Sequence, residues 1–155
     1  MTAADPATAS ATRTRTTVNR VCSTIVTVVR GRRVTVVRDL VVKLTAGAEE
    51  PERASQAFTV AATAVAAGVG VSLWLTGEAS WFAVPGRAET FELAGAAPMA
   101  DLLAAVLSAG TVTVCTQCAA RRGLTEADLV PGVRIAGAAA FVAEATADTT
   151  QALVY

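Results

Sequence analysis

The stretch "LVVKLTAGAEEPERASQAFTVAATAVAAGVGVSLWLTG", Leu40–Gly77, decides the fold, because two apolar runs flank a helix-like segment in it. The run Leu40–Gly47 is almost continuously apolar, which is typical of a strand buried on both faces. Acidic residues and a proline at Glu49–Glu52 predict a helix start, and Gly68 predicts its end. A second strand follows at Val69–Gly77. A strand–helix–strand unit of this kind predicts parallel strands joined by a right-handed crossover.

The same alternation continues to Tyr155, after an irregular stretch at residues 78–97. The predicted elements are helix Pro98–Gly110, strand Thr111–Cys115, helical turns Thr116–Gly123 and Thr125–Leu129, strand Val133–Gly137, helix Ala138–Ala147 and strand Ala152–Tyr155. The sequence therefore predicts an α/β fold with a mostly parallel, five-stranded sheet covered by helices on both faces. In such a sheet, chemistry gathers at the carboxyl ends of the strands.

Charge divides the chain into two parts. Residues 1–38 contain seven arginines and one acid, whereas residues 39–155 contain six basic and twelve acidic residues, so the parts carry net charges of +6 and −6. An acidic body argues against binding along a phosphate backbone, and the basic part lacks aromatic residues for base stacking. We therefore expect no nucleic-acid partner.

The N-terminal part is expected to be an extension rather than a domain. We predict a basic, partly disordered extension over residues 1–36, with residues 1–20 disordered, because Thr, Ala and Arg offer little to bury. Two β-branched runs, Ile25–Val29 and Val34–Val37, indicate a hairpin within it. The α/β domain is assigned to residues 37–155.

A cytoplasmic protein without a membrane span is expected. Residues 54–77 carry no charge, but they are rich in Ala, Ser and Thr and are interrupted by "AGVGVS" at Ala67–Ser72. The first twenty residues contain no apolar segment typical of a signal peptide.

The candidate site is the pair of cysteines in "TVTVCTQC", Thr111–Cys118. The chain has no histidine, and its only other cysteine is Cys22. It therefore cannot supply the four nitrogen or sulfur ligands of a structural zinc site, and we expect neither a metal nor a cofactor. Cys115 falls where a strand gives way to a helix, and backbone N–H groups there favour the thiolate. Cys118 lies one helical turn further and could meet Cys115 in a disulfide, and Arg121 and Arg122 could add positive potential. The alternative is that both cysteines are small buried residues.

The sequence also resembles a known family. The stretches "RDLVVKLTAGAEEPERASQAFTVAATAVAAG", "GVSLWLTGEA", "GTVTVCTQCAARRGLTEADLVPGVRIAGA" and "ALVY" are similar to the DsrE/DsrF-like family of small sulfur-relay proteins. The resemblance implies a flavodoxin-like three-layer sandwich and a persulfide on the cysteine at the strand end, which is Cys115 here. Cys118 matches a second cysteine that only some relatives have. The resemblance also implies trimers or hexamers.

Three functions remain open at this point. The first is sulfur transfer by a sulfurtransferase-like carrier, with Cys115 and Cys118 as the site and with donor and acceptor proteins as partners. The second is a thiol–disulfide oxidoreductase in which Cys118 resolves, and the third is a non-catalytic oligomeric binding protein. A homo-oligomer is expected, with an aromatic interface formed by Trp74, Trp81, Phe82 and Phe91. The alternative is that these rings fill the core of the monomer.

Overall fold

The computed structural model describes residues 27–29, 32–34 and 38–155, with side chains for the last range. Strands β1 (Thr27–Val29) and β2 (Arg32–Val34) pair antiparallel, with Thr27 opposite Val34. The predicted hairpin is thus present, although its second strand begins at Arg32 rather than at Val34. The disorder predicted for residues 1–20 lies outside the described residues.

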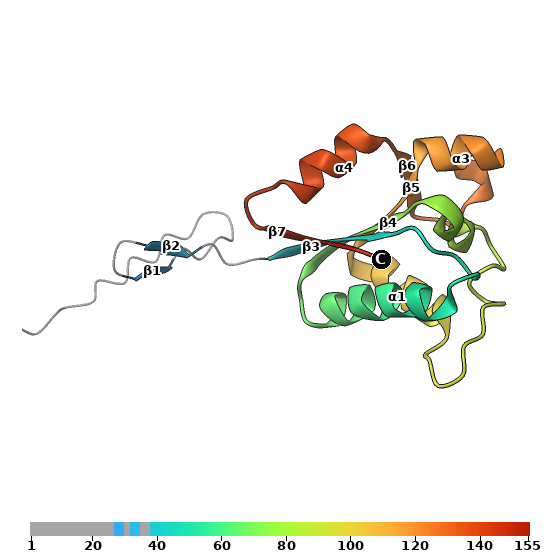
Figure 1. Cartoon of the computed structure of the whole chain (residues 1–155), viewed down its shortest axis with the longest axis horizontal. Coiled ribbons are helices and arrows are strands. Elements are labelled where there is room, and N and C mark those ends of the chain that lie inside the picture. Colours follow the sequence, from blue (N-terminus) through green and yellow to red (C-terminus); the bar gives the residue numbers. More distant parts are fainter. Residues whose placement is uncertain (1–26, 30–31, 35–37) are drawn as a thin grey trace, which may run out of the picture.

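A five-stranded, fully parallel sheet forms the centre of the domain (Figure 1). The strand order is β6-β5-β4-β3-β7, so the chain builds outward from β3 to β6 and then returns to pair β7 with the free edge of β3. The predicted strands are all present, with bounds shifted by up to three residues: β3 (Asp39–Leu44), β4 (Gly70–Leu75), β5 (Thr111–Cys115), β6 (Val133–Ala136) and β7 (Thr150–Val154). The predicted α/β class and three-layer, flavodoxin-like arrangement are confirmed.

Within residues 38–155, four α-helices and two short 3-10 helices join the strands: α1 (Pro51–Ala66), η1 (Gly77–Ala83), α2 (Met99–Ala109), α3 (Thr116–Arg122), η2 (Glu126–Asp128) and α4 (Ala138–Ala145). Figure 1 shows α1 on one side of the sheet and α4 on the other. Within the described parts of the chain, no helix has the length and apolar character needed to cross a membrane.

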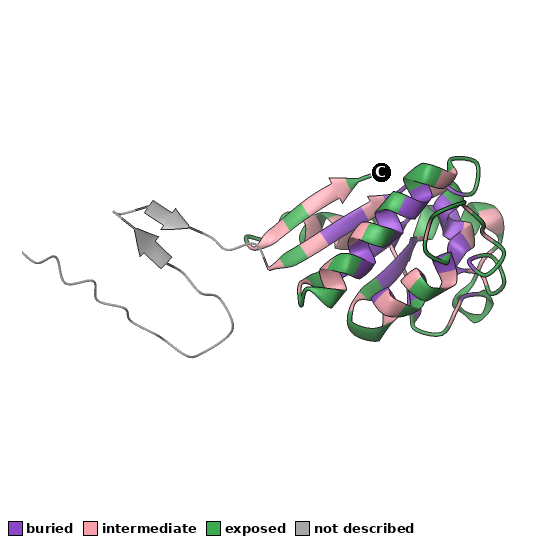
Figure 2. Ribbon diagram, turned by 90° about the horizontal axis from the view of Figure 1, so that it is seen from below, coloured by how far each residue is buried: buried purple, intermediate pink, exposed green. Residues whose placement is uncertain are grey.

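The main core lies between the sheet and α1. Along β4, Val71, Leu73 and Leu75 belong to this core, and Phe58 of α1 is fully buried against it. Figure 2 shows the buried residues on the strands and on the side of α1 that faces them. A helix with one apolar face covers a sheet in this way because burial of that face stabilises both elements.

The segment after β4 is more ordered than predicted. Residues 78–97 were expected to be irregular, but their first part forms η1 because its apolar side chains reach the core. Phe82 is 3% exposed, and its ring packs edge-to-face on Phe58 with centroids 5.6 Å apart. The aromatic interface predicted from the sequence is therefore wrong for Phe82, and also for Trp74, which is 1% exposed.

The opposite face of the sheet is more polar, and α4 lies on it. Ser72 and Trp74 alternate with the core residues of β4 and donate hydrogen bonds to Glu144 of α4, at 2.6 and 2.8 Å. Arg134 of β6 forms an ion pair with the same carboxylate, and the Trp74 ring packs edge-to-face on Phe141. These contacts hold α4 on the sheet by polar bonds and one aromatic pair, and no residue of α4 is buried.

Candidate functional site

Cys115 is the last residue of β5, and α3 begins at the next residue. Its backbone is still extended, with φ −64° and ψ 129°, so the chain turns from strand to helix directly after it. The side chain is partly exposed. The sequence predicted this position, because an apolar strand run ended in a cysteine followed by a helix-forming segment.

The pKa of Cys115 is lowered from the ordinary value of a thiol. Burial acts in the opposite direction, but hydrogen bonding from the backbone and thiol of Cys118 and from the backbone of Gln117 outweighs it, with a further contribution from the charge of Lys43. These groups favour the thiolate because each presents positive charge or a donor to the sulfur. The environment of Cys115 therefore favours the thiolate over the thiol.

Cys118 lies in the first turn of α3 and is buried, with 7% exposure. Its sulfur accepts a hydrogen bond from the Gly77 N–H at 3.2 Å. Gly77 has φ +54°, and a Cβ atom at this position would lie 2.7 Å from the Thr45 carbonyl oxygen. Only glycine fits there without a shift of the neighbouring backbone. The ends of β3 and β4 thus converge to bring a backbone donor to Cys118.

Arg122 connects α3 to η1. Its guanidinium donates to the Glu78 carboxylate at 2.6 Å and to the Cys118 carbonyl oxygen at 3.2 Å, and it lies 5.9 Å from the centroid of the Trp81 ring. The Arg122 side chain is only 13% exposed. Arg122, which was expected to add positive potential at Cys115, instead forms an ion pair with Glu78. The charge that helps to lower the Cys115 pKa comes from Lys43.

Lys43 is the site residue that the sequence analysis missed. It is the only lysine in the chain, and it lies in β3, two strands away from Cys115. Its ammonium group lies 4.9 Å from the centroid of the Phe141 ring. A single charged residue inside the apolar run "LVVKLTAG" was a signal that the residue has a partner, since a lysine is rarely placed in a buried strand without one.

Glu78 and Trp81 also line a cavity of about 320 Å³, together with Glu49, Phe82, Arg87 and Phe91. The Arg87 guanidinium lies 5.2 Å from the centroid of the Trp81 ring, and Phe91 packs edge-to-face on Phe82. The half-buried aromatic rings of this region therefore face a cavity and the core of the same chain.

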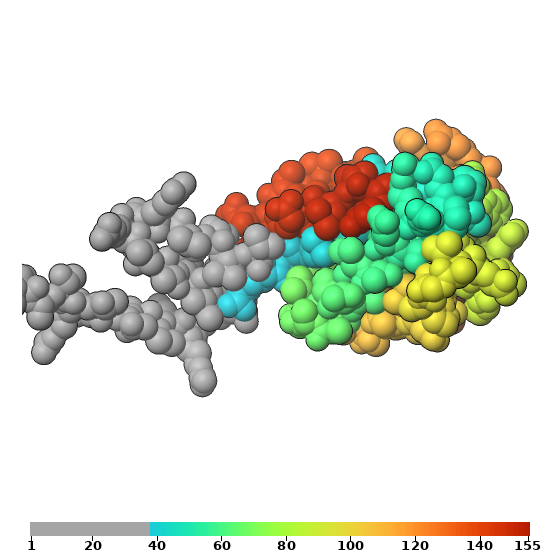
Figure 3. Space-filling view, turned by 60° about the horizontal axis from the view of Figure 1, so that its bottom comes forward, coloured from blue at the N-terminus to red at the C-terminus, as the bar shows by residue number. Residues whose placement is uncertain are grey.

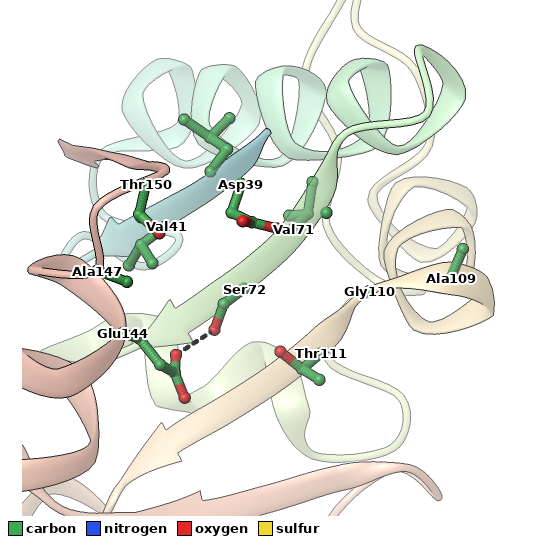
Figure 4. Close-up of a pocket in the computed structure, with 12 residues that line it drawn as sticks. Asp39, Val41, Val71, Ser72, Ala109, Gly110, Thr111, Glu144, Ala147 and Thr150 are labelled. Atoms are coloured by element: carbon green, nitrogen blue, oxygen red, sulfur yellow. Dashed lines mark hydrogen bonds between the residues drawn. The ribbon is translucent and has the colours of Figure 1, made fainter. Parts of the chain in front are cut away.

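A second cavity, of about 450 Å³, lies at the other end of the strands (Figure 4). Its lining includes the first residues of four strands, namely Asp39, Gly70, Thr111 and Thr150. Figure 4 shows the Glu144 carboxylate pointing across β4 to the Ser72 hydroxyl. Because Cys115 is at the carboxyl end of β5, this cavity does not belong to the thiol site.

No group of three or more His, Cys, Asp and Glu side chains suited to a metal ion occurs in the part of the chain that the structure describes. The groups that favour a thiolate at Cys115 are the backbone and thiol of Cys118, the Gln117 backbone and the charge of Lys43. Such a site can hold an anionic sulfur at Cys115 and place a second sulfur beside it.

The model of the DsrE/DsrF-like family matches residues 39–149. The chain belongs to this family. The matched range of this DsrE-like protein includes both Cys115 and Cys118, and it begins at the first residue of β3. The family resemblance noted in the sequence is thereby confirmed.

Two solved structures share the fold of this DsrE-like protein. The YchN protein from Escherichia coli is similar with a TM-score of 0.63 and 16% identity, over 76% of this chain and 99% of that one. MTH1491 from Methanobacterium thermoautotrophicum, described as a protein of unknown function, is similar with a TM-score of 0.57 and 9% identity, over 76% of this chain and 98% of that one. No curated protein sequence matches the chain.

Proposed function

We propose that the protein is a cytoplasmic sulfur carrier that holds sulfane sulfur as a persulfide on Cys115. The family is known for sulfur relay. The observation that carries the proposal is the position of a partly exposed thiol, Cys115, at the carboxyl end of β5 and directly before α3, where neighbouring donors also lower its pKa. A thiolate at this edge can meet a donor protein without any movement of the core.

The uptake step is a transfer between two thiols. The Cys115 thiolate attacks the terminal sulfur of a donor persulfide, a sulfur–sulfur bond forms to Cys115, and the donor's own sulfur–sulfur bond breaks. The donor leaves as a thiolate and takes a proton from water. The new terminal sulfur is anionic, so the Gln117 and Cys118 backbone and the Lys43 charge that favour the thiolate also favour the persulfide.

The experiment is uptake of sulfur from glutathione persulfide, followed by alkylation and intact-mass measurement. All variants carry Cys22→Ser, so that only the two site cysteines can react. We expect Cys118→Ser to gain the mass of one sulfur atom and Cys115→Ser to gain none. Uptake by Cys115→Ser, or none by any variant with Cys115 intact, overturns the proposal, and the second result favours a non-catalytic binding protein.

We also propose that the protein forms a homo-oligomer, a trimer or a hexamer, through the α4 side. Helix α4 is almost entirely apolar, yet none of its residues is buried within the chain. Val142 of α4 and Val154 of β7 are the two large apolar side chains left exposed in the described residues, at 54% and 67%. Figure 3 shows that β7, in red, lies at the surface beside α1.

Light scattering at micromolar concentration tests this assembly. Val142→Glu places a charge on the exposed side of α4 and is expected to reduce the mass to that of a monomer. Val154→Glu places the same charge at the exposed position of β7 and tests whether β7 belongs to the same interface. A monomeric mass for the unmodified chain overturns the proposed assembly.

A further inference from the structure

The two site cysteines differ in access but share one environment. Cys115 is partly exposed, whereas Cys118 is 7% exposed one helical turn away. Cys115 immediately precedes α3 and Cys118 is its third residue, and the Gly77 N–H donates to the Cys118 sulfur at 3.2 Å. A backbone donor therefore contacts the buried thiol, and the accessible thiol lies one helical turn away from it.

We propose that Cys118 resolves the Cys115 persulfide, so that the protein releases hydrosulfide and is left with a Cys115–Cys118 disulfide. This inference rests on the proposed persulfide at Cys115. It gives the protein a second activity besides transfer, namely the reduction of its own bound sulfane sulfur to sulfide.

The step balances without an added oxidant. The Cys118 thiol gives its proton to the terminal sulfur of the persulfide, and its sulfur attacks the Cys115 sulfur. A bond forms between the two cysteine sulfurs, and the bond from Cys115 to the terminal sulfur breaks. The electron pair of the broken bond leaves with the terminal sulfur as hydrosulfide. The sulfane sulfur is reduced, and the two cysteines are together oxidised to the disulfide.

Three features of the structure favour this reaction. Thiols separated by two residues at the start of a helix lie within reach of a disulfide. The Gly77 N–H stabilises negative charge on Cys118 as that sulfur loses its proton. The burial of Cys118 keeps an external donor from loading it, so sulfur enters at Cys115 and Cys118 remains free to attack.

Arg122 holds the parts of this arrangement together. It joins α3 to η1 through the Glu78 carboxylate and the Cys118 carbonyl oxygen, and Gly77 is the first residue of η1. The backbone donor and the buried thiol are therefore on two elements that the Arg122–Glu78 ion pair connects.

The consequence is a carrier that retains sulfur for a limited time. If an acceptor takes the sulfur first, Cys115 returns to a thiolate. If none arrives, Cys118 discharges the persulfide as hydrosulfide, and a dithiol reductant must reduce the disulfide before another cycle begins. The balance between transfer and discharge then depends on how quickly the acceptor reaches Cys115.

The test follows the fate of sulfur after loading. The Cys22→Ser protein and its Cys118→Ser and Cys118→Ala variants are loaded with glutathione persulfide, freed of donor by gel filtration and sampled over time. Hydrosulfide is trapped with monobromobimane, and each chain is alkylated and weighed without reduction. Circular dichroism shows whether the variants are folded. Serine and alanine differ in polarity, so a result that both variants share comes from the loss of the thiol and not from the new side chain.

We expect the protein with both cysteines to release one hydrosulfide for each loaded chain. Its final mass should be two hydrogens below that of the reduced chain before loading. Both Cys118 variants should keep the persulfide about tenfold longer or more, because a neighbouring thiol acts at a high effective concentration. Equal persistence with and without Cys118, or hydrosulfide release without a disulfide, overturns the inference while leaving the carrier intact. Failure of folded Cys118 variants to load overturns the proposed persulfide carrier and this inference with it.

Discussion

Replacing Gly77 with alanine tests the convergence of β3 and β4 behind Cys118. The added Cβ must accept φ +54°, which costs a residue other than glycine about 1–2 kcal/mol. The same atom would lie 2.7 Å from the Thr45 carbonyl oxygen, and overpacking of this kind costs about 1–3 kcal/mol. We therefore expect Gly77→Ala to lower the free energy of unfolding by about 2–5 kcal/mol, the sum of these two effects.

Gly68→Ala is the matched control. Gly68 also has a positive φ, +76°, but nothing lies within 4 Å of the Cβ that would be added there. This variant should lose only the conformational part, about 1–2 kcal/mol. Urea unfolding followed by tryptophan fluorescence gives both values, provided that the dependence on urea is the same in each variant. Equal destabilisation of the two variants would show that the approach of Thr45 to Gly77 is not as close as the structure has it.

Three further predictions concern charge and the N-terminal extension. Because the pKa of Cys115 is lowered, alkylation of the folded protein should reach its midpoint at a lower pH than in the urea-unfolded chain, and Lys43→Met should move that midpoint upward. The Glu144 pKa is also lowered, since hydrogen bonds from Ser72, Trp74 and Arg134 outweigh burial. The ionised Glu144 carboxylate therefore contributes its full stabilisation above the pKa of the unfolded carboxyl, and this stabilisation is lost as the pH falls through the pKa in the folded protein. Glu144→Gln should therefore reduce the acid sensitivity of unfolding, whereas Glu144→Ala should cost about 1–3 kcal/mol more at neutral pH because the Trp74 N–H loses its acceptor. Removal of residues 1–36 should leave the melting temperature unchanged by differential scanning calorimetry, and a large decrease would assign part of that extension to the domain.

The strands could be predicted because their signal is local. The run before Gly47 and the run "TVTVC" are apolar enough that their composition alone predicts buried strands. The structure places both in the sheet within a few residues of the predicted bounds. The position of Cys115 followed from the same signal, since it required only the end of a strand and the start of a helix.

The partners of Cys115 and Cys118 could not be predicted in this way, because topology brings them together. Lys43 acts on Cys115 through its charge from β3, two strands away, and the strand order that sets their separation is not written in either segment. Gly77 was interpreted as the end of a strand, and its contact with Cys118 spans 41 positions in the chain. The rings in the segment after β4 were assigned to an interface because composition alone does not show which side a ring faces.

The pairing of β7 with β3 has a consequence for the newborn chain. The paired residues of the two strands are 111 positions apart, for example Asp39 and Thr150. The ribosome makes β7 after the other four strands of this sheet, so β3 has an open edge while β4, β5 and β6 can already assemble on its other side. An open edge of an apolar strand is a template for wrong pairing with another chain. Among the strands of the sheet, β3 is therefore the one that a chaperone would have most reason to shield during synthesis.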